Sequence, residues 1–174
     1  QTNQHELAGW VKKNVSFPSS MVDRITPRTT HTLREEVEEL FPSRGYNAIQ
    51  CEEYTQWVIE DKFASDFPDL TQVGVTITDD IEPYEETKIR ILNGGHTALA
   101  YLGALSGYNT FDQVMNNEAL RNHFKQLQKE EIVPSIEMEL PFDINEYVEK
   151  IEERFASTTN HDELERICMD GFTK

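Results

Sequence analysis

The sequence predicts a mainly α-helical domain with a few short β-strands. Apolar residues recur at helical spacing in several segments, for example Leu120, Phe124 and Leu127 at i, i+4 and i+7. The strand signals are shorter, and the clearest is the alternation of apolar with small or polar residues over 73–77. A chain of 174 residues without repeats or low-complexity tracts is the length of one domain, so we expect 1–174 to fold as a unit.

The composition excludes several classes of partner. The chain has 32 acidic and 16 basic residues, and its formal net charge is −16. Such a surface repels nucleic acid and anionic membranes, so we expect neither as a partner. No apolar run is long enough for a membrane span. Cys51 and Cys168 lack metal-ligand spacing, which predicts a cytoplasmic protein without a disulfide framework or a zinc site.

The first half of the chain alternates helix and strand signals. We expect the end of a helix around Leu7 to Val11, an extended segment over 21–26, and a helix begun by a capping box over 32–35. The β-branched and aromatic residues of 49–59 predict a short strand with Trp57 packed inward. The alternation over 73–77 predicts another strand.

The second half reads as consecutive helices. Asp79, Asp80 and Pro83 suit the start of a long helix that ends at Ser106-Gly107. Thr110 suits the cap of a short helix, and the helix around Phe124 follows. Further helices are expected over 143–155 and from Asp162 to Gly171.

Three chemically different side chains lie close together in the long helix. At 100° per residue, Lys88, Asn93 and His96 fall at about 0°, 140° and 80°, within one arc. The two glycines between Asn93 and His96 each cost roughly 1 kcal/mol relative to alanine. Close approach of a ligand or of a second helix would explain them. One interpretation is therefore a single cavity lined by an amine, an amide and an imidazole. The other interpretation is that the three residues do not act together: the lysine is solvated, the asparagine lies near a helix end and the histidine is structural.

A family resemblance favours the first interpretation. Lys-x4-Asn-x2-His, followed by Ala-Tyr-Leu-Gly at 100–103, resembles the catalytic helix of the polyol-specific long-chain dehydrogenase/reductases, the family of mannitol 2-dehydrogenase and fructuronate reductase. Two further segments resemble that family in the same order: Phe-Pro-Ser-Ser-Met-Val-Asp-Arg-Ile-Thr-Pro at 17–27 and Gln-Trp-Val-Ile-Glu-Asp at 56–61. The resemblance covers nearly the whole chain.

The resemblance implies a fold and a domain organisation. It implies that 1–174 is the multi-helical C-terminal domain, similar to that of 6-phosphogluconate dehydrogenase. The family's Rossmann domain would precede it, and we expect that domain to be absent, since the chain begins with Gln rather than Met and has no Gly-x-Gly-x-x-Gly. NAD or NADP would then be bound mainly by that missing partner domain. The family needs no metal.

The resemblance also implies roles for the residues of the long helix. Lys88 would be the general base that takes the alcohol proton, which requires an uncharged amine. Asn93 would hold the developing oxyanion, and His96 would orient a neighbouring hydroxyl. Glu85, three residues before Lys88, would relay protons to it, although an ordinary surface Glu–Lys pair fits the spacing equally well.

Three further residues would contact the substrate. Asp23 matches an aspartate of the family's substrate pocket, whereas a local ion pair with Arg24 is the structural alternative. Arg166 and Lys174 match a segment that reaches the substrate's far hydroxyls, although Phe172 departs from the small polar residue usual there.

The expected reaction is oxidation of a secondary alcohol to a ketone by NAD(P), for example D-mannitol to D-fructose. A uronate reductase acting on fructuronate or tagaturonate is the alternative within the family. An acidic, non-catalytic helical dimerisation module is the alternative outside it. Because the family's oxyanion hole also uses an upstream asparagine, we expect the chain alone to be inactive.

Overall fold

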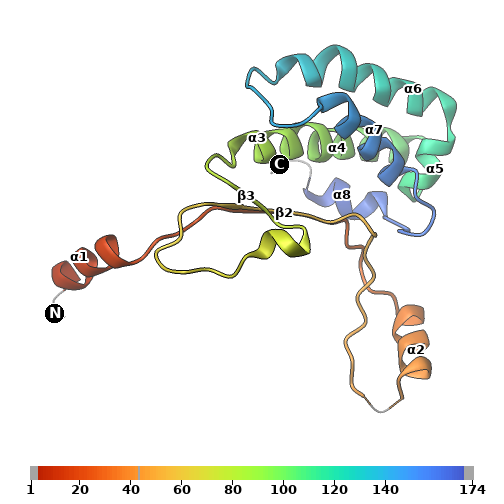
Figure 1. Ribbon diagram of the computed structural model, residues 1–174. Helices are drawn as coiled ribbons and strands as arrows, with labels where there is room; N and C mark the ends of the chain where they lie inside the picture. The colour runs from red at the N-terminus through yellow and green to blue at the C-terminus, as the bar shows by residue number, and fades with distance from the viewer. Residues whose placement is uncertain (1–3, 43, 171–174) are drawn as a thin grey trace.

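The computed structural model describes residues 4–42 and 44–170 and confirms the predicted mainly α-helical class (Figure 1). The strands are β1 (Ser20–Asp23), β2 (Gln56–Glu60) and β3 (Thr76–Thr78). The helical elements in chain order are α1 (Gln4–Asn14), α2 (His31–Leu40), the 3-10 helix η1 (Leu70–Val73), α3 (Glu82–Thr87), the π-helix η2 (Lys88–Gly94), α4 (Gly95–Leu105), α5 (Phe111–Asn116), α6 (Glu118–Leu127), the π-helix η3 (Gln128–Ile132), the 3-10 helix η4 (Val133–Ser135), α7 (Ile144–Phe155) and α8 (Leu164–Asp170).

The three strands form one small mixed sheet in the order β1-β2-β3. β1 pairs antiparallel with β2, with Met21 opposite Val58, and β2 pairs parallel with β3, with Ile59 opposite Ile77. Met21, Val58 and Ile81 form a small core where the sheet meets the start of α3. The sheet therefore lies directly against the helix that carries Lys88.

The main core lies among the helices. α4 packs against α5, α6 and α8, so its apolar side chains are covered on several sides (Figure 1). The completely buried side chains of this core include Phe111, Phe124, Phe155, Ile151, Leu99 and Leu164. Asp143 begins α7, as expected, because its carboxylate accepts hydrogen bonds from the backbone N–H groups of the first turn. We find no described helix with the length and apolar character of a bilayer span.

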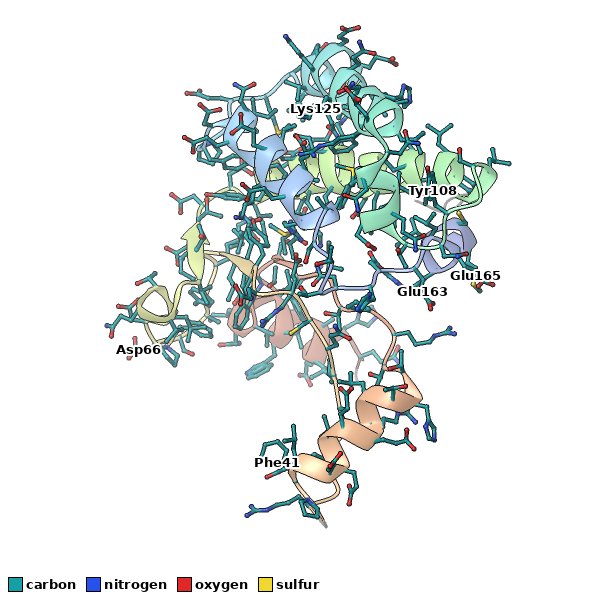
Figure 2. All side chains as sticks on the ribbon, turned by 90° about the vertical axis from the view of Figure 1, so that its right-hand side faces the viewer. Phe41, Asp66, Tyr108, Lys125, Glu163 and Glu165 are labelled. Atoms are coloured by element: carbon teal, nitrogen blue, oxygen red, sulfur yellow. The ribbon has the colours of Figure 1, made fainter. Side chains whose placement is uncertain are left out.

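Two segments extend away from this body. α1 lies at one end of the molecule, and α2 lies at the end of an arm formed by the chain before and after it (Figure 1). The two legs of the arm are joined by a hydrogen bond from Thr29 Oγ1 to the carbonyl of Ala48, at 2.8 Å. Neither helix buries a residue fully, and Phe41 lies near the far end of the arm (Figure 2).

The predicted cap of α2 was wrong by two residues. Thr30, rather than Thr32, is the N-cap, and its hydroxyl accepts from the backbone N–H of Leu33 at 3.2 Å. The sequence offers a threonine at both positions, and the extended backbone of Thr30 is the conformation that an N-cap requires.

Two predicted strands were also longer than the strands in the structure. Only the last part of 49–59 is a strand, and Trp57 is 39% exposed instead of packed inward, with its indole N–H donating to the hydroxyl of Ser20. In the next segment Val73 ends η1 and is exposed, because Gly74 takes a positive φ of 87° and breaks the alternation. β3 is therefore shorter than the pattern predicted.

Candidate active site

Lys88, Asn93 and His96 lie on one continuous helix with a π-helical centre. α3 runs into η2, which spans Lys88 to Gly94, and η2 runs into α4. Backbone hydrogen bonds of a π-helix join residues five apart, so Lys88 and Asn93 lie one turn apart on the same side. The α-helical expectation placed them about 140° apart, and the structure corrects it. Single π-turns inside α-helices are frequent at functional sites.

The amine of Lys88 points toward the sheet. Its Nζ donates a hydrogen bond to the backbone carbonyl of Val22 in β1. The side chain is only partly buried. It is therefore more exposed to water than we expected for a lysine that is kept neutral by burial. The contact nevertheless holds the amine at the place where the helix and the sheet meet.

Asn93 and Glu85 lie on either side of Lys88 along the helix, and both are partly buried. Glu85 lies in α3, three residues before Lys88. Within the described part of the chain, no hydrogen bond or ion pair joins Glu85 to Lys88. The relay therefore remains a prediction.

His96 is buried in the first turn of α4, with 6% of its surface exposed. Its ring is stacked on Phe155, with centroids 4.6 Å apart and an interplanar angle of 17°. Phe111 contacts it at 4.0 Å between centroids. The Nε2 atom lies 3.0 Å from Oδ2 of Asp162. The imidazole is therefore held on three sides and cannot rotate freely.

Asp162 joins two of the predicted site residues. Its Oδ1 accepts from Arg166, whose Nε lies 3.1 Å away and whose terminal nitrogen also contacts it. Its Oδ2 faces His96. Burial by itself raises the pKa of Asp162, but the hydrogen bonds and charges of His96 and Arg166 outweigh burial and lower the pKa. Asp162 is therefore an anion that connects α4 to α8.

Asp23 is engaged by an arginine that the sequence did not single out. Its two carboxylate oxygens each accept from Arg154 of α7, at 2.8 Å, and both side chains are 3% exposed. Glu52 binds the same guanidinium at 2.6 and 3.0 Å, and the ring of Tyr54 covers it at 4.1 Å. In this arrangement Asp23 connects β1 to α7, and its contact with substrate stays a prediction. Arg24, the alternative ion-pair partner, instead donates to the carbonyl of Glu52.

Arg166 also lines a cavity. The cavity measures about 190 Å³, and its wall combines apolar surface with side chains of both charges, Arg28 and Glu163 among them. Its lining includes Arg28, Asn160, His161 and Arg166.

The predicted contact at Lys174 lies outside the described residues. Among the described residues, no group of three or more His, Cys, Asp or Glu is placed to hold a metal ion.

Comparison with known proteins places this geometry in a family. The model of the mannitol dehydrogenase C-terminal domain matches residues 80–174. The chain belongs to the mannitol dehydrogenase family. The model of that family's Rossmann domain matches residues 1–72. The family models thus divide the chain near 72–80, whereas we expected all of 1–174 to be C-terminal domain.

Relatives agree with this assignment. The chain is 38% identical to D-mannonate oxidoreductase of Escherichia coli over 174 residues, which is 100% of this chain and 36% of that protein. It is 39% identical to mannitol 2-dehydrogenase of Aspergillus fumigatus over 173 residues, or 97% of this chain and 34% of that protein. A solved ternary complex of Pseudomonas fluorescens mannitol 2-dehydrogenase with NAD and D-mannitol superposes with a TM-score of 0.82, at 38% identity, over 94% of this chain and 33% of that one. The chain therefore spans about a third of the length of these relatives.

The site lies where the two family segments meet. Val22 and Asp23 belong to the Rossmann-matched segment, whereas Lys88 and Arg154 belong to the C-terminal segment. The Lys88–Val22 hydrogen bond and the Arg154–Asp23 salt bridge both cross this boundary. In this member of the mannitol dehydrogenase family, the two segments are thus held together next to the proposed base.

Sequence reasoning missed two functional candidates. Asp162 was read only as the start of a helix, although its position four residues before Arg166 is a spacing at which opposite charges pair. Arg154 had no comparable signal, because its partners lie 131 and 102 residues away in the chain.

Proposed function

We propose that this chain carries the substrate-binding and catalytic residues of an NAD(P)-dependent polyol dehydrogenase, which oxidises a secondary alcohol to a ketone, as in D-mannitol to D-fructose. One observation carries the proposal. Lys88 and Asn93 share one side of a π-turn in a mannitol dehydrogenase family chain, and the Lys88 amine is anchored to the sheet. This pairs a proton acceptor with an amide donor one turn away.

The proposed mechanism assigns each group one task. A neutral Lys88 amine directs one N–H to the Val22 carbonyl, and its lone pair takes the proton of the alcohol. The Asn93 amide donates to the oxygen, which develops negative charge as the C–H bond breaks. His96 and Arg166 orient hydroxyls farther along the polyol. Glu85 passes the proton from Lys88 toward solvent.

The hydride acceptor is the nicotinamide cofactor, which supplies the oxidising power of the reaction when bound. The described residues contain no Gly-rich turn between a parallel strand and a helix, which is where such cofactors place their phosphates. The cofactor would therefore be held mainly by Rossmann-domain residues beyond this chain, and the choice between NAD and NADP rests there. For the same reason, we expect this chain alone to lack activity.

A substitution of Lys88 tests the proposal in the complete dehydrogenase, the product of the whole reading frame. Lys88→Ala should lower kcat by about a hundredfold or more, because general-base catalysis contributes about 10²–10⁴-fold. Added methylamine should restore part of the rate, since it replaces the missing base. Lys129→Ala, at an exposed lysine of η3, is the matched control and should retain the wild-type rate. A fully active Lys88→Ala enzyme would instead favour the acidic, non-catalytic dimerisation module.

A uronate reductase is the second candidate. The cavity beside Arg166 is also lined by Arg28, and two guanidinium groups suit a sugar acid's carboxylate, although Glu163 lines the same cavity. The 38% identity to D-mannonate oxidoreductase over the whole chain agrees with this alternative. Steady-state kinetics with D-mannitol, D-fructose, fructuronate and tagaturonate would separate the two.

We also propose a cytoplasmic location, which the unpaired Cys51 and Cys168 support.

A further inference from the structure

We propose that Asp162 is a positioning residue, which fixes the proton of His96 on Nε2 and sets the distance between His96 and Arg166. The inference rests on the proposed function, because it requires these two side chains to orient a polyol. It concerns a carboxylate that does not itself touch the substrate.

The first argument is that the two carboxylate oxygens of Asp162 face different partners. Oδ2 lies 3.0 Å from Nε2 of His96, whereas Oδ1 accepts from Nε of Arg166 at 3.1 Å and from its terminal nitrogen. Oδ1 is thus hydrogen-bonded to Arg166, whereas Oδ2 faces Nε2 at ion-pair distance without the alignment of a hydrogen bond. With 5% of Asp162 exposed, water has little access to compete for these contacts.

The second argument is that the backbone of Asp162 is fixed. Its carbonyl accepts from the N–H of Phe111 at 3.1 Å. Two residues later, the N–H of Leu164 donates to the carbonyl of Asn109 at 2.9 Å, and Thr110 pairs with Glu163 in an isolated bridge. These bonds tie the start of α8 to the start of α5. The carboxylate is thus presented from a braced segment and not from a free loop end.

The third argument is the packing of the imidazole. Phe155 stacks on one face of His96 and Phe111 contacts the ring as well, so a ring flip would require both aromatic side chains to move. A carboxylate facing Nε2 stabilises the tautomer that carries its proton there. In the neutral ring, Nδ1 is then the acceptor. The contacts of Asp162 therefore define which nitrogen of His96 can accept a hydrogen bond.

The alternative is that Asp162 only stabilises the packing of α4 against α8. In that case its substitution would change the melting temperature but not the tautomer of His96. The test must therefore read the imidazole directly, in addition to activity.

The first measurement uses the 174-residue chain labelled with ¹⁵N-histidine. Long-range ¹H–¹⁵N correlation spectra should place the proton of His96 on Nε2 in the wild type, with the signal assigned by its loss in His96→Gln. Asp162→Asn should move His96 toward the Nδ1–H tautomer, and Asp162→Glu should restore Nε2–H because the carboxylate returns. A wild-type His96 protonated on Nδ1 or averaging between tautomers overturns the proposal, even if no variant folds.

The second measurement uses the complete dehydrogenase. Asp162→Asn should raise KM for the polyol about tenfold, the size of one lost charge-assisted hydrogen bond, with a smaller change in kcat. Glu165→Gln is the control, since this carboxylate lies at the surface of α8 (Figure 2) and its loss should leave KM unchanged. An unchanged KM in Asp162→Asn overturns the proposal. Failure of the proposed function would appear separately, as an active Lys88→Ala enzyme with the His96 tautomer intact.

Discussion

The guanidinium of Arg154 and the carboxylate of Asp23 meet in a two-point salt bridge with both N–O distances at 2.8 Å. Both side chains are buried, and Glu52 shares the same guanidinium. Burial by itself lowers the pKa of Arg154, but the two carboxylates outweigh burial and raise it, so the arginine stays charged. One cation thereby holds two buried anions of the Rossmann-matched segment against the C-terminal segment.

Removal of this cation should destabilise the fold strongly. Arg154→Met keeps the length of the side chain but leaves Asp23 and Glu52 as buried, unpaired charges, which costs about 3–5 kcal/mol. Urea unfolding of the 174-residue chain measures the loss. Arg121→Met is the matched control, because Arg121 is 46% exposed and its pair with Glu152 is worth about 1 kcal/mol or less. Equal losses in the two variants would contradict a special role for Arg154.

The buried carboxylate of Asp162 predicts an acid-dependent loss of stability. Its pKa in the folded chain is lowered, so the unfolded chain binds a proton first as the pH falls. The stabilisation is fully present above the unfolded pKa of about 3.9 and is lost as the pH falls through the folded value. As the pH falls below about 4, the free energy of unfolding should therefore fall more steeply in the wild type than in Asp162→Asn. Urea midpoints measured as the pH is lowered give both slopes, and equal slopes in the two proteins would contradict the prediction.

Local signals were sufficient for much of the helical body. The helix α7 has a capping aspartate at its start, and Ile151 and Phe155 lie on the face that enters the core. The motif from Lys88 to His96 was also visible, since it depends on residues close together in sequence. Predictions of this kind succeed where the relevant interactions are local.

Non-local contacts account for what was not predictable. The π-turn leaves no trace in the apolar pattern around Ile91, because an α-helix would bury the same residues. The partner of Asp23 is set by packing α7 against the sheet, and the partner of His96 by packing α8 against α4. Trp57 was misplaced for a similar reason, since its exposure depends on what covers β2.

The π-turn should depend on Gln128. This side chain is completely buried, and its amide donates to the carbonyl of Ile91, within η2, at 2.9 Å. Gln128→Met keeps the approximate size but removes the donor, so the turn should relax and shift Asn93 relative to Lys88. Because misplacement of about 1 Å can cost up to a hundredfold, we expect kcat/KM of the complete dehydrogenase to fall about tenfold or more. Gln126→Met, at an exposed position of α6, should keep the wild-type value, and an equally active Gln128→Met enzyme would refute the dependence.

Two adjacent glycines should respond oppositely to alanine. A Cβ at Gly95 would lie 2.4 Å from Nε2 of Gln128 and 2.8 Å from the ring of Phe124. Both neighbours are completely buried and cannot withdraw, so Gly95→Ala should cost about 1–3 kcal/mol. At Gly94 the nearest atom is the carbonyl oxygen of Ile89, at an ordinary 3.6 Å, so alanine should be neutral or stabilise by up to about 1 kcal/mol. Urea unfolding of both variants measures the difference. The expected close approach of a second helix thus explains Gly95 but not Gly94, and similar losses at the two positions would disprove that distinction.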